Sequence, residues 1–321
     1  MFGKIILVGI FCASMSGQAS GQNETMTLYM ENDGTFIKPL YHTDRHYTNG
    51  TKLAITDQPK DSNFLKEFSR WNGFGENDGE VRTAKGYFLG QNLYTPDFVD
   101  EPQKREKHDM KFAGWLYAGA FAQRAADNQM EHLELNLGVI GPVAEGSETQ
   151  EFVHHFIHVG QPKGWQDQLG DEFHADLMWL RRERLPGLFK RTENFDMHIE
   201  YGGTAGTLQR NAEASIIFRY GINIPNDFGP GRLAAPASAC IDKPANKQSF
   251  YLFTRAGGKL VQYNRFLSGL DAERVVGQWQ IGGVYRYKDF EFIMSETFLT
   301  REYKEPESTD SYGAINLTWH F

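Results

Sequence analysis

Apolar and polar residues alternate along most of this chain. Between residues 131 and 140, for example, Leu133, Leu135, Leu137 and Val139 alternate with small or polar residues. A period of two is typical of a half-buried β-strand, because successive side chains point to opposite faces. The alternation predicts about twelve strands, over residues 25–32, 47–56, 85–94, 112–122, 131–140, 172–180, 195–205, 211–223, 248–264, 274–285, 288–301 and 311–321.

This alternation is compatible with two architectures. In a soluble β-sandwich the apolar faces meet in a core, whereas in an outer-membrane barrel they face lipid. The aromatic content of 14 %, the Tyr, Trp and Phe residues near strand ends and the even strand count favour the barrel, whose girdles are aromatic. We therefore predict that residues 20–321 form one all-β domain, a transmembrane antiparallel barrel of about 12 strands. A soluble periplasmic sandwich is the alternative.

The N-terminal residues have the pattern of a secretory signal. Lys4 precedes a short apolar stretch, and small residues follow as far as Ala19. The apolar stretch is too short to span a bilayer, so we expect residues 1–19 to be a cleaved signal peptide. A lipoprotein signal centred on Cys12 is the alternative. After cleavage only Cys240 would remain, which excludes an intrachain disulfide.

The C-terminal strand ends on Phe321, with apolar residues at alternate positions before it. A terminal aromatic residue resembles the last strand of bacterial outer-membrane barrels, where it helps recognition by the barrel assembly machinery. We therefore expect a bacterial outer-membrane location, with both termini periplasmic and the connections 32–47 and 141–171 outside. Loss of Lys4 would change the net charge from −8 to −9, and such an acidic chain suggests no nucleic-acid partner.

Polar residues gather where the first predicted strand ends and the second begins. Asn32 and Asp33 end the first, and Asp44, Tyr47 and Thr48 stand at the start of the second. Asn and Asp are ordinary turn residues, so one explanation for these polar residues is a hairpin loop. A binding wall of carboxylate, amide and hydroxyl groups is the other explanation.

A second group of polar residues lies in the long connection 141–171. The stretch after Ser147 is predicted to form a short helix. On it Gln150, His154 and His158 share one face at positions i, i+4 and i+8. Histidines four residues apart could bind zinc, but the sequence lacks the glutamate of an HExxH motif. Ser147 is the candidate if a serine nucleophile is involved.

Together these motifs resemble the family of outer-membrane lipid A 3′-O-deacylases. The resemblance extends loosely over the mature chain and is carried by Asn32-Asp33, by Asp44…Tyr47-Thr48-x-Gly50, and by Gly138-Val-Ile-Gly-Pro142 followed by Gln150-x-x-x-His154 and Trp165-Gln-Asp-Gln168. It implies a twelve-stranded barrel whose active site lies between the barrel wall and a helix in an outer loop, on the outer-leaflet side.

The resemblance also implies a function. It is that of a calcium-dependent ester hydrolase that removes an acyloxyacyl chain from the lipid A of lipopolysaccharide, working like a secreted phospholipase A2. His154 would be the general base, since a neutral imidazole suits that role near neutral pH. Asp33, with Asn32 and the Thr48 region, would hold Ca²⁺, which prefers hard oxygen ligands. Gln150 would orient a water molecule or the imidazole.

The chain departs from the family pattern at two positions. The family has a lysine after the third strand, but residues 95–100 contain none and the next one is Lys104. A family acidic residue beyond the histidine falls at about Gly160. These differences leave the exact lipid open. Two other functions remain as alternatives, a non-enzymatic pore or structural barrel and a Ser–His phospholipase acting on glycerophospholipids.

Overall fold

The computed structural model describes most of the mature chain. The described residues are 24–34, 44–57, 63–76, 78–99, 101–102, 108–158, 160–233, 248–304 and 309–321. The predicted signal peptide, Cys240 and Lys104 lie outside these ranges.

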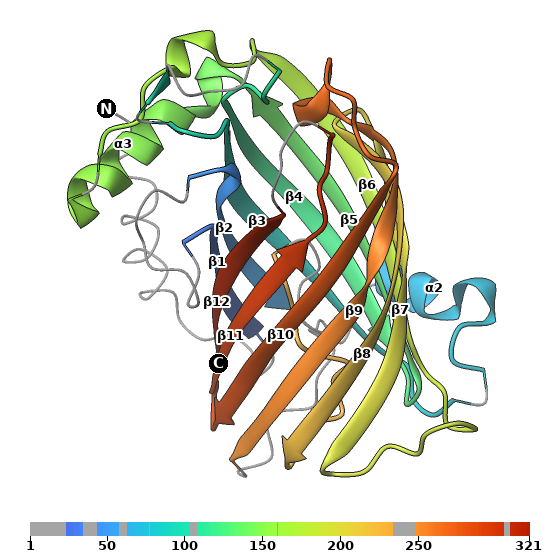
Figure 1. Cartoon of the computed structure of the whole chain (residues 1–321). Helices are drawn as coiled ribbons and strands as arrows, with labels where there is room; N and C mark the ends of the chain where they lie inside the picture. The colour runs from blue at the N-terminus through green and yellow to red at the C-terminus, as the bar shows by residue number, and fades with distance from the viewer. Residues whose placement is uncertain are drawn as a thin grey trace.

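Twelve antiparallel strands form a closed barrel, in which each strand pairs with the next and β1 pairs with β12 (Figure 1). This confirms the predicted fold, and all twelve strands lie within a few residues of the predicted ranges. Their bounds are β1 Glu24–Asn32, β2 His46–Asp57, β3 Arg82–Thr95, β4 Ala113–Ala125, β5 Gln129–Ile140, β6 Glu172–Arg184, β7 Phe195–Gly206, β8 Gln209–Ile222, β9 Ser249–Asn264, β10 Val275–Tyr287, β11 Phe290–Leu299 and β12 Asp310–His320.

The helices are short and lie in the connections. They are α2 (Asn63–Arg70) between β2 and β3, and α3 (Gly146–Ile157) between β5 and β6. Single turns of 3₁₀-helix are η2 (Trp71–Gly73), η4 (Pro142–Ala144), η5 (Trp165–Asp167) and η6 (Arg265–Leu267). No helix among the described residues is long and apolar enough to cross a membrane.

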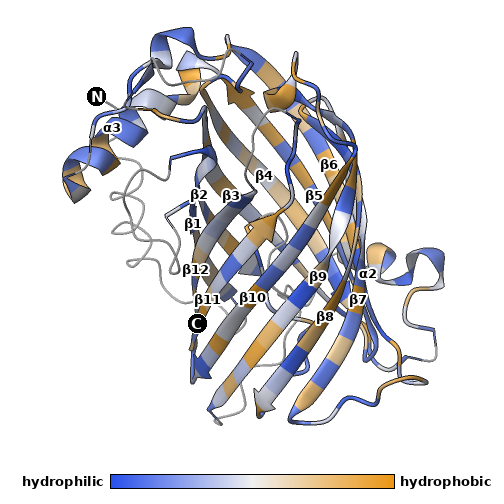
Figure 2. Ribbon diagram, viewed as in Figure 1, coloured by the Kyte–Doolittle hydropathy of each residue, from blue (hydrophilic) through white to orange (hydrophobic). Residues whose placement is uncertain are grey.

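The barrel turns its apolar side chains outward, which decides between the two architectures. On β5, Leu135 and Leu137 are each 43 % exposed, whereas Glu134 and Asn136 between them face the interior and are 3 % and 8 % exposed. Figure 2 shows the resulting alternation along the strands. An apolar exterior around a polar interior is the arrangement of an outer-membrane barrel and the reverse of a soluble sandwich.

The first part of the connection after β8 lies inside the barrel. We call its described part, residues 225–233, the lumen segment. Arg182 donates to the carbonyl oxygen of Phe228 at 2.6 Å, Asn316 to that of Gly231 at 3.1 Å, and Lys52 to that of Leu233 at 3.3 Å. Because these donors come from β2, β6 and β12, the lumen segment is held from several sides of the barrel.

The described ends of the chain meet at one rim of the barrel. Glu24 and Phe321 exchange two backbone hydrogen bonds of 3.2 and 2.9 Å. The helix α3 lies at the opposite rim (Figure 1), which we call the α3 rim. Connections from odd-numbered to even-numbered strands all lie at the α3 rim, and the two polar groups of the sequence are therefore at the same end.

Candidate active site

The two polar groups of the sequence meet at the α3 rim. The Oδ2 atom of Asp44 lies 2.8 Å from Nε2 of His154 and accepts a hydrogen bond from the Gln150 amide at 3.0 Å. Gln150 and Asp44 are 106 positions apart in the chain. Gln150 and His154 share one buried face of α3, as the helical spacing predicted. His158, which the same spacing grouped with them, is the exposed residue that caps the C-terminus of the helix.

Small residues allow α3 to approach the barrel wall closely. A Cβ atom on Gly114 of β4 would lie 3.0 Å from the Cα atom of Gly146, at the start of α3. A Cβ atom on Gly146 would in turn lie 2.7 Å from the ring of Trp165. Any larger side chain at either glycine would push the helix, and its buried face, away from the strand ends.

Gln150 is held on both sides of its amide. Its Oε1 atom accepts a hydrogen bond from the indole nitrogen of Trp165 at 2.7 Å, and its Nε2 atom donates to Asp44. The Trp165 ring packs against Phe112, with ring centroids 5.0 Å apart. Gln150 therefore acts on His154 through Asp44, which makes it a positioning residue for the carboxylate.

His154 is buried and uses both ring nitrogens. Its Nδ1 atom lies 2.5 Å from the carbonyl oxygen of Gly160. Because a carbonyl oxygen only accepts, Nδ1 carries a proton, and Nε2 is the nitrogen that faces Asp44. The family acidic residue expected near Gly160 is thus replaced by a backbone carbonyl, and the carboxylate comes from Asp44 instead.

Sequence reasoning placed Asp44 in a motif but gave it no role. Its partners lie on another strand connection, and nothing local in the sequence identifies them. The signal that could have found it is the departure at Gly160, since a buried histidine that lacks its usual acidic neighbour needs a carboxylate from elsewhere.

Asn32 and Thr48 join the ends of β1 and β2. The Asn32 amide donates to the carbonyl oxygen of Thr48 at 3.0 Å and accepts from the backbone nitrogen of Gly34 at 2.8 Å. The hydroxyl of Thr48 is 2.7 Å from that of Thr95. Thr48 is also the extra residue where the register of β2 and β3 shifts, and bulges of this kind redirect side chains beside active sites.

Asp33 has a buried carboxylate oxygen that is not satisfied. Its Oδ2 atom accepts from the backbone nitrogen of Arg45 at 2.6 Å, but its buried Oδ1 atom has no hydrogen-bond partner among the described residues. Burial, and then the nearby carboxylate of Asp44, raise the pKa of Asp33 well above its ordinary value. Carboxylates this close repel each other when both are ionised, and a bound cation would offset that repulsion.

The donor set fits calcium better than zinc. Asp33 Oδ1 is an unsatisfied hard oxygen of the kind that Ca²⁺ prefers. The neighbouring oxygens of Asn32 and Thr48 are of the same chemical type, although they already hydrogen-bond to Gly34, Asn32, Asp33 and Thr95. In the part of the chain that the structure describes, no three His, Cys, Asp or Glu side chains are grouped so as to hold a metal. A zinc site on His154 and His158 therefore finds no support, and His158 is exposed at the end of α3.

Ser147 does not form a Ser–His pair. Its hydroxyl donates to Glu151 at 3.3 Å, one turn further along α3. The serine hydrolase alternative therefore lacks the hydrogen bond between nucleophile and base on which it depends.

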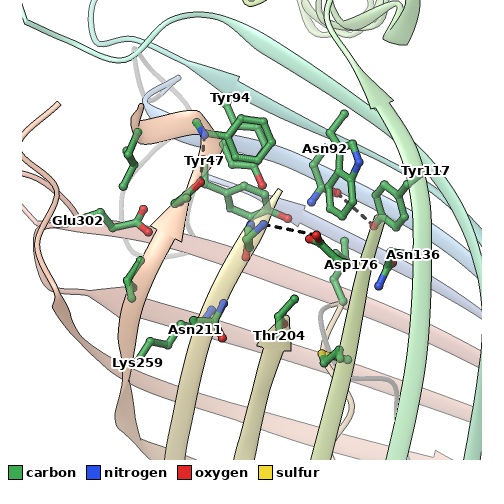
Figure 3. Close-up of a pocket in the computed structure, with 18 of the residues that line it drawn as sticks. Tyr47, Asn92, Tyr94, Tyr117, Asn136, Asp176, Thr204, Asn211, Lys259 and Glu302 are labelled. Atoms are coloured by element: carbon green, nitrogen blue, oxygen red, sulfur yellow. Dashed lines mark hydrogen bonds between the residues drawn. The ribbon is translucent and has the colours of Figure 1, made fainter. Parts of the chain in front are cut away.

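A separate cavity of about 190 Å³ lies inside the barrel (Figure 3). Its polar lining includes Asn92, which accepts a hydrogen bond from Tyr117 at 3.3 Å, and Asp176. Neither Asp33 nor His154 lines it, so the rim site and the lumen cavity are distinct.

The closed twelve-stranded barrel with an apolar exterior defines this protein as a bacterial outer-membrane protein. The family model described as "Outer membrane protein LpxR" matches residues 5–321. The chain therefore belongs to the LpxR family, the lipid A deacylase family that its motifs resemble.

Solved structures agree with the fold. LpxR from Salmonella typhimurium is 20 % identical over 92 % of this chain and 100 % of that chain, with a TM-score of 0.74. The β-domain of the Bordetella autotransporter BrkA is 8 % identical over 93 % of this chain and 98 % of that chain, and its TM-score of 0.45 is too low for any conclusion. No curated protein matches the sequence.

Proposed function

We propose that this protein is an outer-membrane lipid A deacylase that removes an ester-linked acyloxyacyl chain from lipopolysaccharide. Membership of the LpxR family supports the substrate class. The observation that carries the chemistry is the contact of 2.8 Å between His154 and Asp44, beside the unpartnered carboxylate oxygen of Asp33.

His154 is the general base in this proposal. Its Nδ1–H group donates to Gly160, so Nε2 is the basic nitrogen. In the proposed step a water molecule enters between Nε2 and Asp44, replaces their contact of 2.8 Å, and gives a proton to the neutral Nε2. The water oxygen attacks the ester carbonyl, the bond from the carbonyl carbon to the ester oxygen breaks, and the proton passes from His154 to the leaving alkoxide oxygen, so the products are a free fatty acid and an alcohol. Asp44 stabilises the imidazolium form, and general-base catalysis of this kind contributes about 10²–10⁴-fold.

Asp33 is the main candidate ligand for Ca²⁺, and oxygens of Asn32 and Thr48 are the further candidate ligands of the same site. The chemistry that calcium would supply when bound is polarisation of the ester carbonyl and stabilisation of the oxyanion. The hydrogen bonds from Asn32 and Arg45 fix the turn so that the Asp33 carboxylate does not have to be reorganised.

The test is to incubate the refolded protein with purified lipid A, in calcium or in EDTA, and to weigh the products by mass spectrometry. We expect loss of one acyloxyacyl mass in calcium and an intact lipid in EDTA. Intact lipid A in both tubes, with a barrel that still shows heat-modifiable migration on a gel, would remove lipid A as the substrate. Glycerophospholipids would then be tested as the second substrate. A separate test of the mechanism uses a serine-directed phosphonate, and covalent labelling of the protein would contradict direct attack by water.

The non-enzymatic pore is less well supported. The lumen segment contacts Arg182, Asn316 and Lys52 from three strands and so occupies the interior through which ions would have to pass.

A further inference from the structure

The helix α3 presents three different faces. Successive residues of an α-helix are turned by about 100°, so Gln150 and His154 lie on one side, toward the barrel. A second side is polar and exposed. The third is apolar and exposed, and its members Phe152, Val153 and Phe156 are 50 %, 38 % and 73 % exposed. The polar face consists of Glu148, Glu151 and His155.

The connection that carries α3 lies against the outside of the barrel wall. Leu93 of β3 points outward, since it alternates with Asn92 and Tyr94, which line the lumen cavity. It is nevertheless only 2 % exposed, because Phe112 and Trp165 pack over it. Leu93 therefore belongs to the outward row of β3. Further along the strands, side chains in such outward rows face lipid.

A hydrogen bond places the start of the connection on the same outer surface. Gln91, the neighbouring outward position of β3, donates to the carbonyl oxygen of Ala144 at 2.6 Å. Figure 1 agrees, with α3 projecting sideways from the rim beyond the wall formed by β1 to β4.

The apolar face of α3 continues the lipid-facing surface of the barrel. On the same outward row of β3, Leu89 and Tyr87 are exposed. Leu89 lies four residues from Leu93, or about 14 Å along the strand at about 3.4 Å per residue. The helix is therefore at the upper margin of the apolar band, where headgroups meet acyl chains.

A helix with one exposed polar face and one exposed apolar face is typical of a segment that lies in a membrane interface. We propose that Phe152, Val153 and Phe156 insert among the acyl chains of the outer leaflet, with Glu151 and His155 turned toward water. This orientation holds the barrel-facing side of the helix, with Gln150 and His154, at the depth of the ester groups. The consequence for catalysis rests on the proposed function, whereas the insertion itself does not.

Spin labelling tests the insertion without any activity. Phe156→Cys and Glu151→Cys, each in a Cys240→Ser background, are labelled with a nitroxide and reconstituted in phosphatidylethanolamine–phosphatidylglycerol vesicles. We expect the label at position 156 to collide mainly with oxygen and the label at position 151 mainly with a water-soluble nickel complex. Equal access of the nickel complex to both positions would overturn the proposal.

An activity comparison tests the consequence. The double variant Phe152→Ser/Phe156→Ser should lose at least about tenfold in turnover of lipid A held in vesicles, because two large apolar side chains no longer enter the bilayer. It should keep its turnover of lipid A dispersed in detergent micelles. The matched control is Glu148→Gln/Glu151→Gln, on the polar face of the same helix.

The outcomes separate the two proposals. Equal losses in vesicles and in micelles would contradict an interfacial role for the apolar face. If the unaltered protein hydrolyses neither form, the proposed function fails, and the spin-label result still decides whether the helix enters the bilayer.

Discussion

Two groups of buried charge in this barrel differ in how completely they are paired. In the lumen, Asp196 contacts Arg184 and Arg219, and Glu200 contacts Arg182 and Arg232. These acids and bases neutralise one another across neighbouring strands.

At the α3 rim the carboxylates are less completely paired with cationic groups. Asp33 and Asp44 are close enough for the second to raise the pKa of the first, after the effect of burial, and Asp33 keeps one oxygen without a hydrogen bond. The paired charges of the lumen are suited to holding a structure together. At the rim, the incompletely satisfied carboxylate of Asp33 is suited to binding a cation, and Asp44 is placed to act on His154. Substitutions should separate these roles from the structural role of the lumen pairs.

The largest expected effect is on stability and comes from the lumen. Arg182→Leu removes the partner of Glu200 and the donor to Phe228, and breaking a buried ion pair typically costs about 3–5 kcal/mol. The temperature at which the barrel loses its heat-modifiable migration should fall, whereas deacylation per folded molecule should not change. Arg181→Leu, at the adjacent outward position, is the control and should cause a smaller shift. A stable Arg182→Leu barrel without activity would contradict the division of roles.

Asp33→Asn should weaken the dependence on calcium. The amide keeps the size of the side chain and removes its charge, and a hydrogen bond or contact to a charged group is worth about 1.5–3 kcal/mol. The calcium concentration for half-maximal deacylation should therefore rise about 10–100-fold, with the melting behaviour unchanged. An unaltered calcium requirement would show that Asp33 is not a ligand.

Asp44→Asn should lower the rate at saturating calcium. The amide oxygen introduced by this substitution could still accept a hydrogen bond from Gln150, but an uncharged amide could not stabilise a positive charge on His154. We expect turnover to fall about 10–100-fold, as for the loss of one charged contact. Glu148→Gln, on the exposed face of α3, is the control. If the variant loses calcium binding but keeps its rate when calcium is raised, Asp44 would be a metal ligand and not the partner of the base.

The smallest effect should come from Trp165→Phe. The ring still packs against Phe112, but the hydrogen bond to Gln150 is lost, and a neutral hydrogen bond contributes about 0.5–1.5 kcal/mol. Turnover should fall a few-fold, measured with lipid A in micelles. A loss as large as that of Asp44→Asn would mean that Gln150 contacts the reacting groups directly.

Most of the fold could be predicted from the sequence because a barrel depends on a period of two that every strand repeats. The helix predicted after Ser147 is present as Gly146–Ile157, and its spacing correctly placed Gln150 and His154 on one face. The lumen segment could not be predicted in the same way. Its inward path depends on donors from strands far apart in sequence, such as Asn316 and Lys52.

The candidate site was predictable only in part for a related reason. Residues on one helix or one strand end can be grouped by spacing, but the contact between Asp44 and His154 joins two connections that meet only when the barrel closes. The bulge at Thr48 likewise depends on pairing with β3. Local sequence therefore indicates which groups are available, and the closed barrel decides which of them touch.

In the proposed mechanism His154 activates water for the hydrolysis of lipid A. The most direct measurement compares the unaltered protein with His154→Ala and His155→Ala, whose side chains lie on the buried and the exposed face of the same helix. Each refolded barrel is given lipid A and calcium, and the released acyl chain is followed by mass spectrometry. We expect a loss of about 10²–10⁴-fold in turnover for His154→Ala and none for His155→Ala. Equal rates for all three proteins, with lipid A being deacylated, would contradict it.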